Sequence, residues 1–165
     1  MRILGVDPGS RHCGWAVVER HGGRVQALAW GRFSPSADGS LAGRLLAIAS
    51  GLAAAIAEHR PDAAVVERVF HGVSSRSLIV LAEARGAILL ELARAGLPVH
   101  ELAPAAIKSA VAGSGRADKQ QVARMVRLQL ALGARSLAAD ASDALAVALA
   151  GSQLVGLSVA RRVSS

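Results

Sequence analysis

The sequence predicts an α/β protein built on one mixed sheet of five strands flanked by helices. Three short apolar runs come first, and turn residues of the hairpin type separate them. Helical patterns then alternate with two further short apolar runs. An antiparallel start followed by helix, strand, helix and strand gives a mixed sheet, in which right-handed crossovers place the fourth strand parallel to the first.

Turn residues delimit the first three strands. A Pro-Gly-Ser sequence at 8–10 ends the first run, and Gly22-Gly23 lies in a hairpin turn between the second and the third. A polar loop at 34–40 follows the third run. The expected strands therefore cover residues 2–6, 13–19 and 25–33.

Proline and glycine delimit the later elements. Pro61 stops the first helix, Gly96 is the expected residue after the second, and Pro104 opens the third. A Gly-Ser-Gly turn at 113–115 separates the third helix from the fourth. The predicted helices cover residues 41–58, 77–95, 104–112, 117–132 and 139–149, and the remaining strands cover residues 63–67 and 98–102.

Length and composition fit one globular domain. The chain has 165 residues, of which 52% are hydrophobic and 19% are charged, and it is too short for a two-lobed ATPase or kinase. We expect a single domain over residues 1–157 and a short basic tail over 158–165. One cysteine excludes an internal disulfide framework and fits a reducing, cytoplasmic setting.

The charge balance indicates a polyanionic partner. Lys and Arg total 19 against 12 Asp and Glu, which gives a formal net charge of +7. Two apolar stretches, at 45–57 and 144–160, were compared with membrane segments. The first is shorter than the roughly 20 residues that a spanning helix needs, and Ser152 and Gln153 interrupt the second. We interpret both as buried helices and expect no membrane partner.

Acidic residues end two strands that are predicted to be parallel neighbours. Asp7 follows the apolar run at 3–6, and Glu67 follows the run at 63–66. Ionised carboxylates rarely stand against apolar strands without a partner, and ligands of open α/β sheets gather beyond the carboxyl ends of strands. Asp140 and Asp143 are spaced to share one helix face, and the alanines around them allow close packing on the sheet.

Four carboxylates that converge at one place repel one another, and bound divalent cations relieve that repulsion. Hard oxygen ligands suit Mg²⁺, with Mn²⁺ as the alternative, and two ions about 4 Å apart can activate a water and stabilise the leaving oxygen of a phosphodiester. Taken singly, each acid has an ordinary explanation as a turn residue, a helix N-cap or half of a surface ion pair. The joint pattern favours a metal site.

Four sequence blocks together resemble the RuvC family of Holliday-junction resolvases. They are Ile-Leu-Gly-Val-Asp-Pro-Gly-Ser-Arg at 3–11, Val-Glu-Arg-Val-Phe at 66–70, Glu-Ala-Arg-Gly at 83–86 and Ala-Asp-Ala-Ser-Asp-Ala-Leu-Ala at 139–146. They occur in the order of the family and run through nearly the whole chain. The opening block alone is weak, since actin-like ATPases and other nucleases have similar openings.

The resemblance implies a ribonuclease-H-like fold, a homodimer, and Mg²⁺-dependent nicking of two symmetric strands of four-way junction DNA. It implies a cytoplasmic, nucleoid-associated enzyme that is coordinated with a branch-migration helicase complex. Val73 and Ser74 stand where the family usually shows a polar residue and asparagine, which leaves the cleavage-site preference open. The acidic tetrad of the family, which holds the metal, falls on Asp7, Glu67, Asp140 and Asp143.

Lys108 and Lys119 are the only lysines in an arginine-rich chain, which indicates that compact point charges are needed there. They match positions that the family uses near the scissile phosphate, so we assign them to phosphate binding and Lys119 also to catalysis. Exposed Phe70 would stack on unstacked bases at the junction centre. Ordinary surface cations and a core phenylalanine are the plainer explanations. The predicted DNA-binding residues are Phe70, Arg76, Lys108, Arg116, Lys119 and Arg124.

The predicted helix at 77–95 has apolar residues on more than one face, at positions 78, 79, 81, 88, 89, 90 and 92. One face can cover the sheet and another a second copy of the chain, which would supply two active sites for a nearly two-fold junction. Three alternative functions stay open at this point. They are a nuclease of the same fold that processes structured RNA, a nucleotide-binding ATPase of the actin type, and a non-catalytic junction-binding protein.

Overall fold

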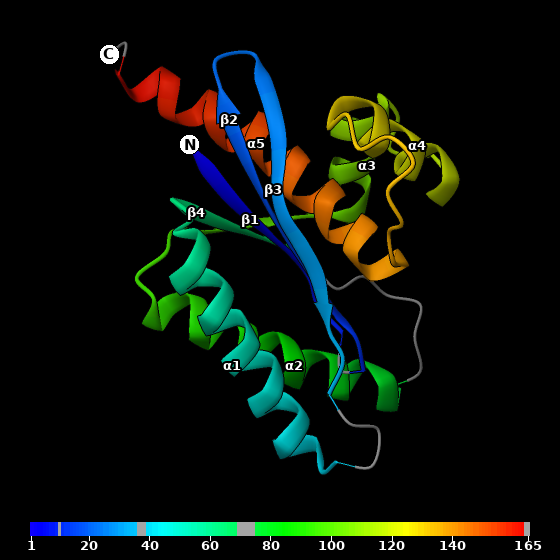
Figure 1. Ribbon diagram of the computed structural model, residues 1–165. Helices are drawn as coiled ribbons and strands as arrows, with labels where there is room; N and C mark the ends of the chain where they lie inside the picture. Colours follow the sequence, from blue (N-terminus) through cyan, green and yellow to red (C-terminus); the bar gives the residue numbers. More distant parts are fainter. Residues whose placement is uncertain (10, 36–38, 69–74, 164–165) are drawn as a thin grey trace.

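The computed structural model describes residues 1–9, 11–35, 39–68 and 75–163 (Figure 1). A five-stranded mixed sheet of order β3-β2-β1-β4-β5 confirms the predicted class. The first strand pairs antiparallel with the second and parallel with the fourth, as expected from right-handed crossovers. The strands are β1 (Arg2–Asp7), β2 (Cys13–His21), β3 (Arg24–Phe33), β4 (Ala63–Glu67) and β5 (Val99–Leu102).

In the described part of the chain, most helices begin and end close to the predicted residues. Arg60 ends the first helix in the left-handed conformation, with φ 47°, and its N–H donates to the carbonyl of Ile56. Gly96, with φ 68°, follows the second. The helices are α1 (Leu41–His59), α2 (Ser75–Arg94), α3 (Pro104–Ala112), α4 (Lys119–Gln129) and α5 (Ala139–Val163).

α4 begins at Lys119, later than the predicted residue 117, because Asp118 caps it. The Asp118 carboxylate accepts a hydrogen bond from the Gln121 N–H at 2.8 Å. In return, the Gln121 side-chain oxygen accepts from the Asp118 N–H at 3.0 Å. This reciprocal capping box satisfies two backbone donors and fixes the direction in which the first turn of α4 leaves the loop.

α5 extends to Val163, well beyond the predicted end at residue 149. The small and polar residues at 151–153 do not stop it. A Cβ on Gly151 would lie 2.4 Å from Val65 Cγ2, so this glycine permits close packing on the sheet. Ser152 is fully buried, and its hydroxyl donates to the Leu149 carbonyl at 2.8 Å. The division into a domain at 1–157 and a tail at 158–165 stays a prediction.

The helices form a layer on each face of the sheet (Figure 1). α1 and α2 lie on one face, and α5 lies across the other, with α3 and α4 packed against α5. The side chains of β1 alternate between the two layers, because Leu4 and Val6 pack with the α1–α2 cluster and Ile3 packs with the α5 cluster. The core therefore has two halves, and the sheet carries apolar residues on both of its faces.

Glycines set how closely α5 approaches the sheet. A Cβ on Gly5 of β1 would lie 2.4 Å from the Ala148 nitrogen, and a Cβ on Gly14 of β2 would lie 2.1 Å from the Asp140 carbonyl oxygen. Both contacts are with backbone atoms, which cannot rotate away. The start of α5, including Asp140, therefore rests directly on β2 at the point where β2 pairs with Asp7.

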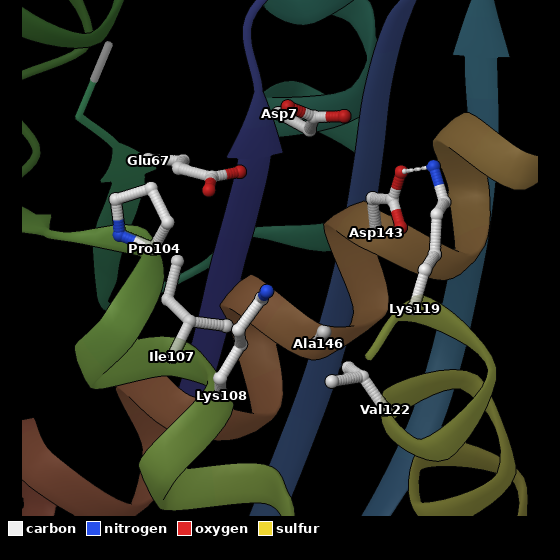
Figure 2. Close-up of a pocket in the computed structure, with 9 residues that line it drawn as sticks. All are labelled: Asp7, Glu67, Pro104, Ile107, Lys108, Lys119, Val122, Asp143 and Ala146. Carbon is white, nitrogen blue, oxygen red and sulfur yellow. Dashed lines mark hydrogen bonds and ion pairs between the residues drawn. The ribbon is translucent and has the colours of Figure 1, made fainter. Parts of the chain in front are cut away.

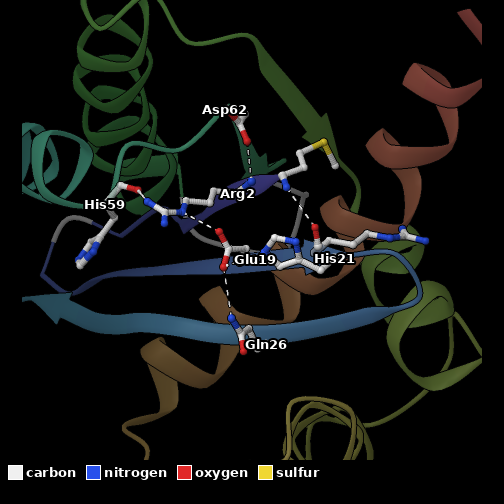
Figure 3. Close-up of polar contacts among 8 residues, drawn as sticks. Arg2, Glu19, His21, Gln26, His59 and Asp62 are labelled. Atoms are coloured by element: carbon white, nitrogen blue, oxygen red, sulfur yellow. Dashed lines mark hydrogen bonds and ion pairs between the residues drawn. The ribbon is translucent and has the colours of Figure 1, made fainter. Parts of the chain in front are cut away.

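Polar contacts hold the start of β1 to its neighbours, at the opposite end of the strand from Asp7 (Figure 3). Arg2 Nε pairs with Glu19 at 3.0 Å, and Arg2 Nη1 donates to the His59 carbonyl at 2.9 Å. The Arg2 N–H donates to the Asp62 carboxylate at 2.7 Å. These bonds join β1 to β2, to the end of α1 and to the start of β4, and so support the register in which Asp7 and Glu67 become neighbours.

One helix of the described residues, α1, is long and apolar enough by length and composition to cross a membrane. Core helices of soluble proteins pass the same test, and a single helix of this kind is weak evidence. Ile48 and Leu52 of α1 are fully buried in the cluster between α1, α2 and the sheet. Only 17% of the apolar stretch of α1 is buried and Leu46 is 68% exposed, so the predicted burial of residues 45–57 holds for one face of α1 only.

Replacing Gly14 with alanine is expected to destabilise the protein by about 1–3 kcal/mol, because the added methyl group would overlap the Asp140 backbone and displace the start of α5. Urea unfolding measures the effect. Gly23→Ala is the matched control, since no atom lies within 4 Å of its added Cβ, and it should change stability by less than about 0.5 kcal/mol. Equal stability of the two variants would contradict this account of α5 packing.

Candidate active site

The ends of β1 and β4 bring Asp7 and Glu67 together. The parallel register pairs Val6 with Val66, so the two acids that follow stand side by side at one edge of the sheet. Both line a pocket of about 240 Å³ that lies between the strand ends and α3, α4 and α5 (Figure 2). The apolar strand pattern, with right-handed crossovers between strands, predicted this juxtaposition.

The N-terminal part of α5 supplies the other two acids, Asp140 in its first turn and Asp143 just after it, and they have different surroundings. Asp143 lines the pocket with Asp7 and Glu67. Asp140 does not line it, and its carboxylate lies 3.6 Å from Arg32 Nη1 at the end of β3. Asp140 nevertheless acts electrostatically on Asp7, together with Glu67 and Asp143. All four predicted acids therefore meet in one region, although only three share the pocket.

Crowding strongly perturbs the titration of the strand-end acids. Burial, together with the negative charges of Glu67, Asp143 and Asp140, raises the pKa of Asp7 from 3.8 to about 7. Burial and Asp143 also raise the pKa of Glu67, while a hydrogen bond with Asp7 opposes the change. Without cations, Asp7 therefore keeps its proton up to about neutral pH.

Both lysines of the chain line the acidic pocket (Figure 2). Lys119 Nζ donates to Asp143 at 2.7 Å, and this hydrogen bond raises the pKa of Lys119. The capping box at Asp118 places Lys119 at the first position of α4. Lys108 comes from α3, on the other side of the pocket, and its charge lowers the pKa of Glu67. The two cations face the acids from two separate helices.

The donor set of this region fits a hard divalent cation. Its acids offer only oxygen atoms, and their mutual repulsion is the condition that such an ion relieves. Within the described ranges, no three Asp, Glu, His or Cys side chains stand close enough together to hold an ion as they are placed. Lys119 instead occupies one Asp143 oxygen at hydrogen-bonding distance. Binding of an ion would therefore require the carboxylates to move closer together.

The predicted DNA-binding arginines lie apart from the pocket. Arg116 and Arg124 are exposed and line a separate hollow of about 480 Å³ between α3 and α4. Arg127, on the same helix as Arg124, instead donates to the carbonyls of Gly133 and Arg135 at 3.1 and 2.8 Å. Phe70 lies outside the described residues. Arg76 falls in the first turn of α2, and its role in DNA binding stays a prediction.

Sequence reasoning missed Arg32 as a neighbour of the site. It lies at the end of β3, pairs with Gly14 in the sheet, and is 46% exposed. No motif in the sequence links residue 32 to residue 140. Only the pairing of β3 with β2, and of β2 with the start of α5, brings this cation to Asp140.

A mixed sheet of this order, with acids gathered beyond two parallel central strands, is the arrangement of nucleases with the ribonuclease-H-like fold. The model of the family "Crossover junction endodeoxyribonuclease RuvC" matches residues 3–151. The chain belongs to this family.

Individual relatives agree with this assignment along nearly the whole chain. RuvC of Sorangium cellulosum is 43% identical over 99% of this chain and 91% of its own length. RuvC of Anaeromyxobacter dehalogenans is 49% identical over 90% of this chain and 79% of its own. The structure of T. thermophilus RuvC in complex with Holliday junction substrate matches with a TM-score of 0.90 and 31% identity over 96% of each chain. The yeast mitochondrial Holliday junction resolvase, at 15% identity and a TM-score of 0.60, shares the fold.

The raised pKa of Asp7 predicts how the stability of the metal-free protein depends on pH. Because the folded state holds this proton more tightly than the unfolded chain does, stability should fall as pH rises from about 4 to about 7. Asp7→Asn removes that loss. It should stabilise the protein at pH 8 by up to about 4 kcal/mol, an upper limit from about 1.4 kcal/mol per pH unit, and change little at pH 4.

Urea unfolding with a chelator present, at a series of pH values, measures this difference. Asp62→Asn is the comparison variant, because its carboxylate lies at the other end of β1. A stability difference between Asp7→Asn and wild type that does not vary with pH would contradict the proposed crowding.

Proposed function

We propose that this chain resolves four-way DNA junctions by paired symmetric nicks, using the pocket at the ends of β1 and β4 as its active site. The observation that carries the proposal is the convergence of Asp7, Glu67 and Asp143 on one pocket, with Asp140 beside it, in a member of a metal-dependent nuclease family. The net charge of +7 supports attraction of a polyanion to a site that is itself acidic.

Asp7, Glu67, Asp140 and Asp143 would hold Mg²⁺ or Mn²⁺, and we propose two ions per site. Bound ions of this kind lower the pKa of the attacking water and stabilise the leaving oxygen of the phosphodiester. The residues themselves have definable tasks. Asp7 would serve as a ligand in its deprotonated form, and Asp143 would offer the carboxylate that Lys119 contacts in the metal-free protein.

Lys119 lines the same pocket, so its ammonium would contact the scissile phosphate. Lys108 would approach the same phosphate from α3, on the other side of the pocket. A compact ammonium that faces developing negative charge stabilises the transition state, so Lys119 is a proposed catalytic residue. Arg116 and Arg124 would bind flanking phosphates and add affinity that depends on salt and not on base sequence. Phe70 and Arg76 are proposed to act at the junction centre.

A homodimer is the proposed assembly, and the outer face of α2 supports it. Ala84, Ile88 and Leu92 are fully buried, whereas Ile79 and Leu90 on another face are 61% and 53% exposed. Gly86 lies between these two exposed side chains on the helix, and no atom lies within 4 Å of a Cβ built there. A second copy could therefore approach this stripe closely. We also propose a cytoplasmic, nucleoid-associated location and coordination with a branch-migration helicase complex.

Asp7→Asn should reduce nicking of a mobile four-way junction by more than about 100-fold in either Mg²⁺ or Mn²⁺, because a central ligand is lost. Junction binding should persist or strengthen, since one like charge is removed. Denaturing gels that map cleavage at nucleotide resolution give the first readout, and a binding assay in chelator gives the second. Glu58→Gln, whose side chain is 76% exposed on α1, is the matched control.

The same assay separates the alternative functions. Preferential cutting of structured RNA would favour an RNA-processing nuclease, and wild-type binding without cutting in either metal would favour a non-catalytic junction-binding protein. Unimpaired cutting by Asp7→Asn would refute the proposed site.

Leu90→Glu should convert the proposed dimer to a monomer, because it places a charge in the middle of the apolar stripe on α2. Analytical ultracentrifugation measures the mass. Leu128→Glu is the control, since Leu128 is 63% exposed on α4 and lies away from α2. A wild-type protein that stays monomeric at high concentration would remove the proposed dimer and leave the active-site assignment in place.

A further inference from the structure

The carboxylate of Glu101 bridges two arginines next to the end of β4. Its Oε1 accepts a hydrogen bond from Nη2 of Arg85, which comes from α2. Its Oε2 lies 3.5 Å from Nε of Arg68, the residue that follows Glu67. Glu101 pairs with Val66 in the sheet, and Val66 packs with the α1–α2 cluster. The three charged residues therefore join α2, β5 and the end of β4.

The inner half of this network is the Arg85–Glu101 pair, and the outer half is the Arg68–Glu101 pair. Arg85 depends on Glu101 for charge compensation. The Arg85 side chain is only 22% exposed, and its Nε is buried without a hydrogen-bond partner. Among the described residues, Glu101 is the ion-pair partner of Arg85. Removing the carboxylate would leave a largely buried guanidinium uncompensated, which is costly in a low-dielectric setting. The outer half is more exposed, because the Arg68 side chain is 60% accessible to solvent.

The outer half reaches the active-site strand through one residue. The Arg68 N–H donates to the Leu102 carbonyl at 2.8 Å, and Leu102 pairs with Glu67. Arg68, the residue after Glu67, is therefore bound to β5 at two points. Its backbone N–H bonds Leu102, and its side chain pairs with the Glu101 carboxylate. Arg68 lies one residue beyond β4, but its N–H continues the hydrogen bonding to β5, so the alternation of side chains along a strand extends to it. Fixing Arg68 toward α2 therefore favours a Glu67 side chain that faces the pocket on the other side.

We propose that Glu101 is a positioning residue for Glu67, acting through Arg68. This inference rests on the proposed function, because it assumes that Glu67 holds the metal. Loss of a residue that orients a metal ligand without contacting the metal commonly reduces metal affinity or activity by about 10–100-fold. Glu101 pairs with Val66, whose side chain faces the α1–α2 cluster, and Glu101 does not line the pocket.

The test is Glu101→Gln in the full chain, compared with wild type. Mn²⁺ affinity without DNA, followed by electron paramagnetic resonance of the free ion, should weaken by about 10–100-fold. Hydrogen exchange of the Arg68 amide should accelerate in the metal-free protein, because Arg68 loses its side-chain anchor. Nicking should need more Mn²⁺ for half-maximal rate, while junction affinity in chelator changes little.

Glu91→Gln is the matched control. Glu91 also pairs with an arginine of α2, Arg94, at 3.6 Å, but it has no link to β4. It should leave Mn²⁺ affinity and Arg68 exchange unchanged. A folded Glu101→Gln protein with wild-type Mn²⁺ affinity would overturn the proposal, and so would an equal loss of affinity in Glu91→Gln.

Arg68→Gln covers the case in which Glu101→Gln does not fold. It cuts the network at its exposed end and leaves the Arg85–Glu101 pair intact. Mn²⁺ affinity should again fall, and an unchanged affinity would overturn the proposal. Failure of the proposed function gives a different result, because wild-type protein would then neither bind Mn²⁺ at the pocket nor nick the junction.

Discussion

The close docking of α5 on the sheet is the constraint on which the site depends. Gly5, Gly14 and Gly151 have no side chains to hold the helix away, so its backbone lies directly against β1, β2 and Val65. This contact carries Asp140 and Asp143 into the field of Asp7 and Glu67, and it is the reason why burial and like charges raise the pKa of Asp7 to about 7. Packing of the apolar core therefore supports an electrostatically unfavourable cluster, which a metal ion could turn into a stable one.

Lys119 partly compensates for this repulsion in the metal-free protein. Its ammonium lies 2.7 Å from Asp143, and the capping box at the start of α4 holds the backbone from which the side chain extends. Lysine suits this position better than arginine because its charge is compact and its stem is flexible. Under the proposed function, the same side chain neutralises a carboxylate in the metal-free protein and would contact a phosphate when DNA is bound. A bidentate guanidinium bound to Asp143 would be harder to release.

The sequence was sufficient for the sheet and for the four acids, because both follow from local patterns. Apolar runs that end in Asp7 and Glu67 are visible without a structure, and so is the spacing of Asp140 and Asp143. It was not sufficient for features that arise between distant elements. The small residues after Leu149 resemble a helix end, yet Gly151 is needed for packing against Val65. Nothing local shows that Asp140 would face Arg32 while Asp143 faces Lys119.

Glu101, on the face of the sheet that α1 and α2 cover, has a proposed role that also could not be predicted from the sequence. In the sequence it is one acid in a short strand, and its two arginine partners are 16 and 33 positions away in the chain, at Arg85 and Arg68. The parallel register of β4 and β5 brings Glu101 close to the active-site acid, because it places Glu101 beside Val66 and Leu102 beside Glu67. Because Arg85 belongs to α2, whose outer face is the proposed dimer interface, the network connects that helix to the active-site strand by two ion pairs. If Glu101 positions Glu67 as proposed, the position of α2 and the direction of Glu67 are linked, although no described residue of α2 lines the pocket.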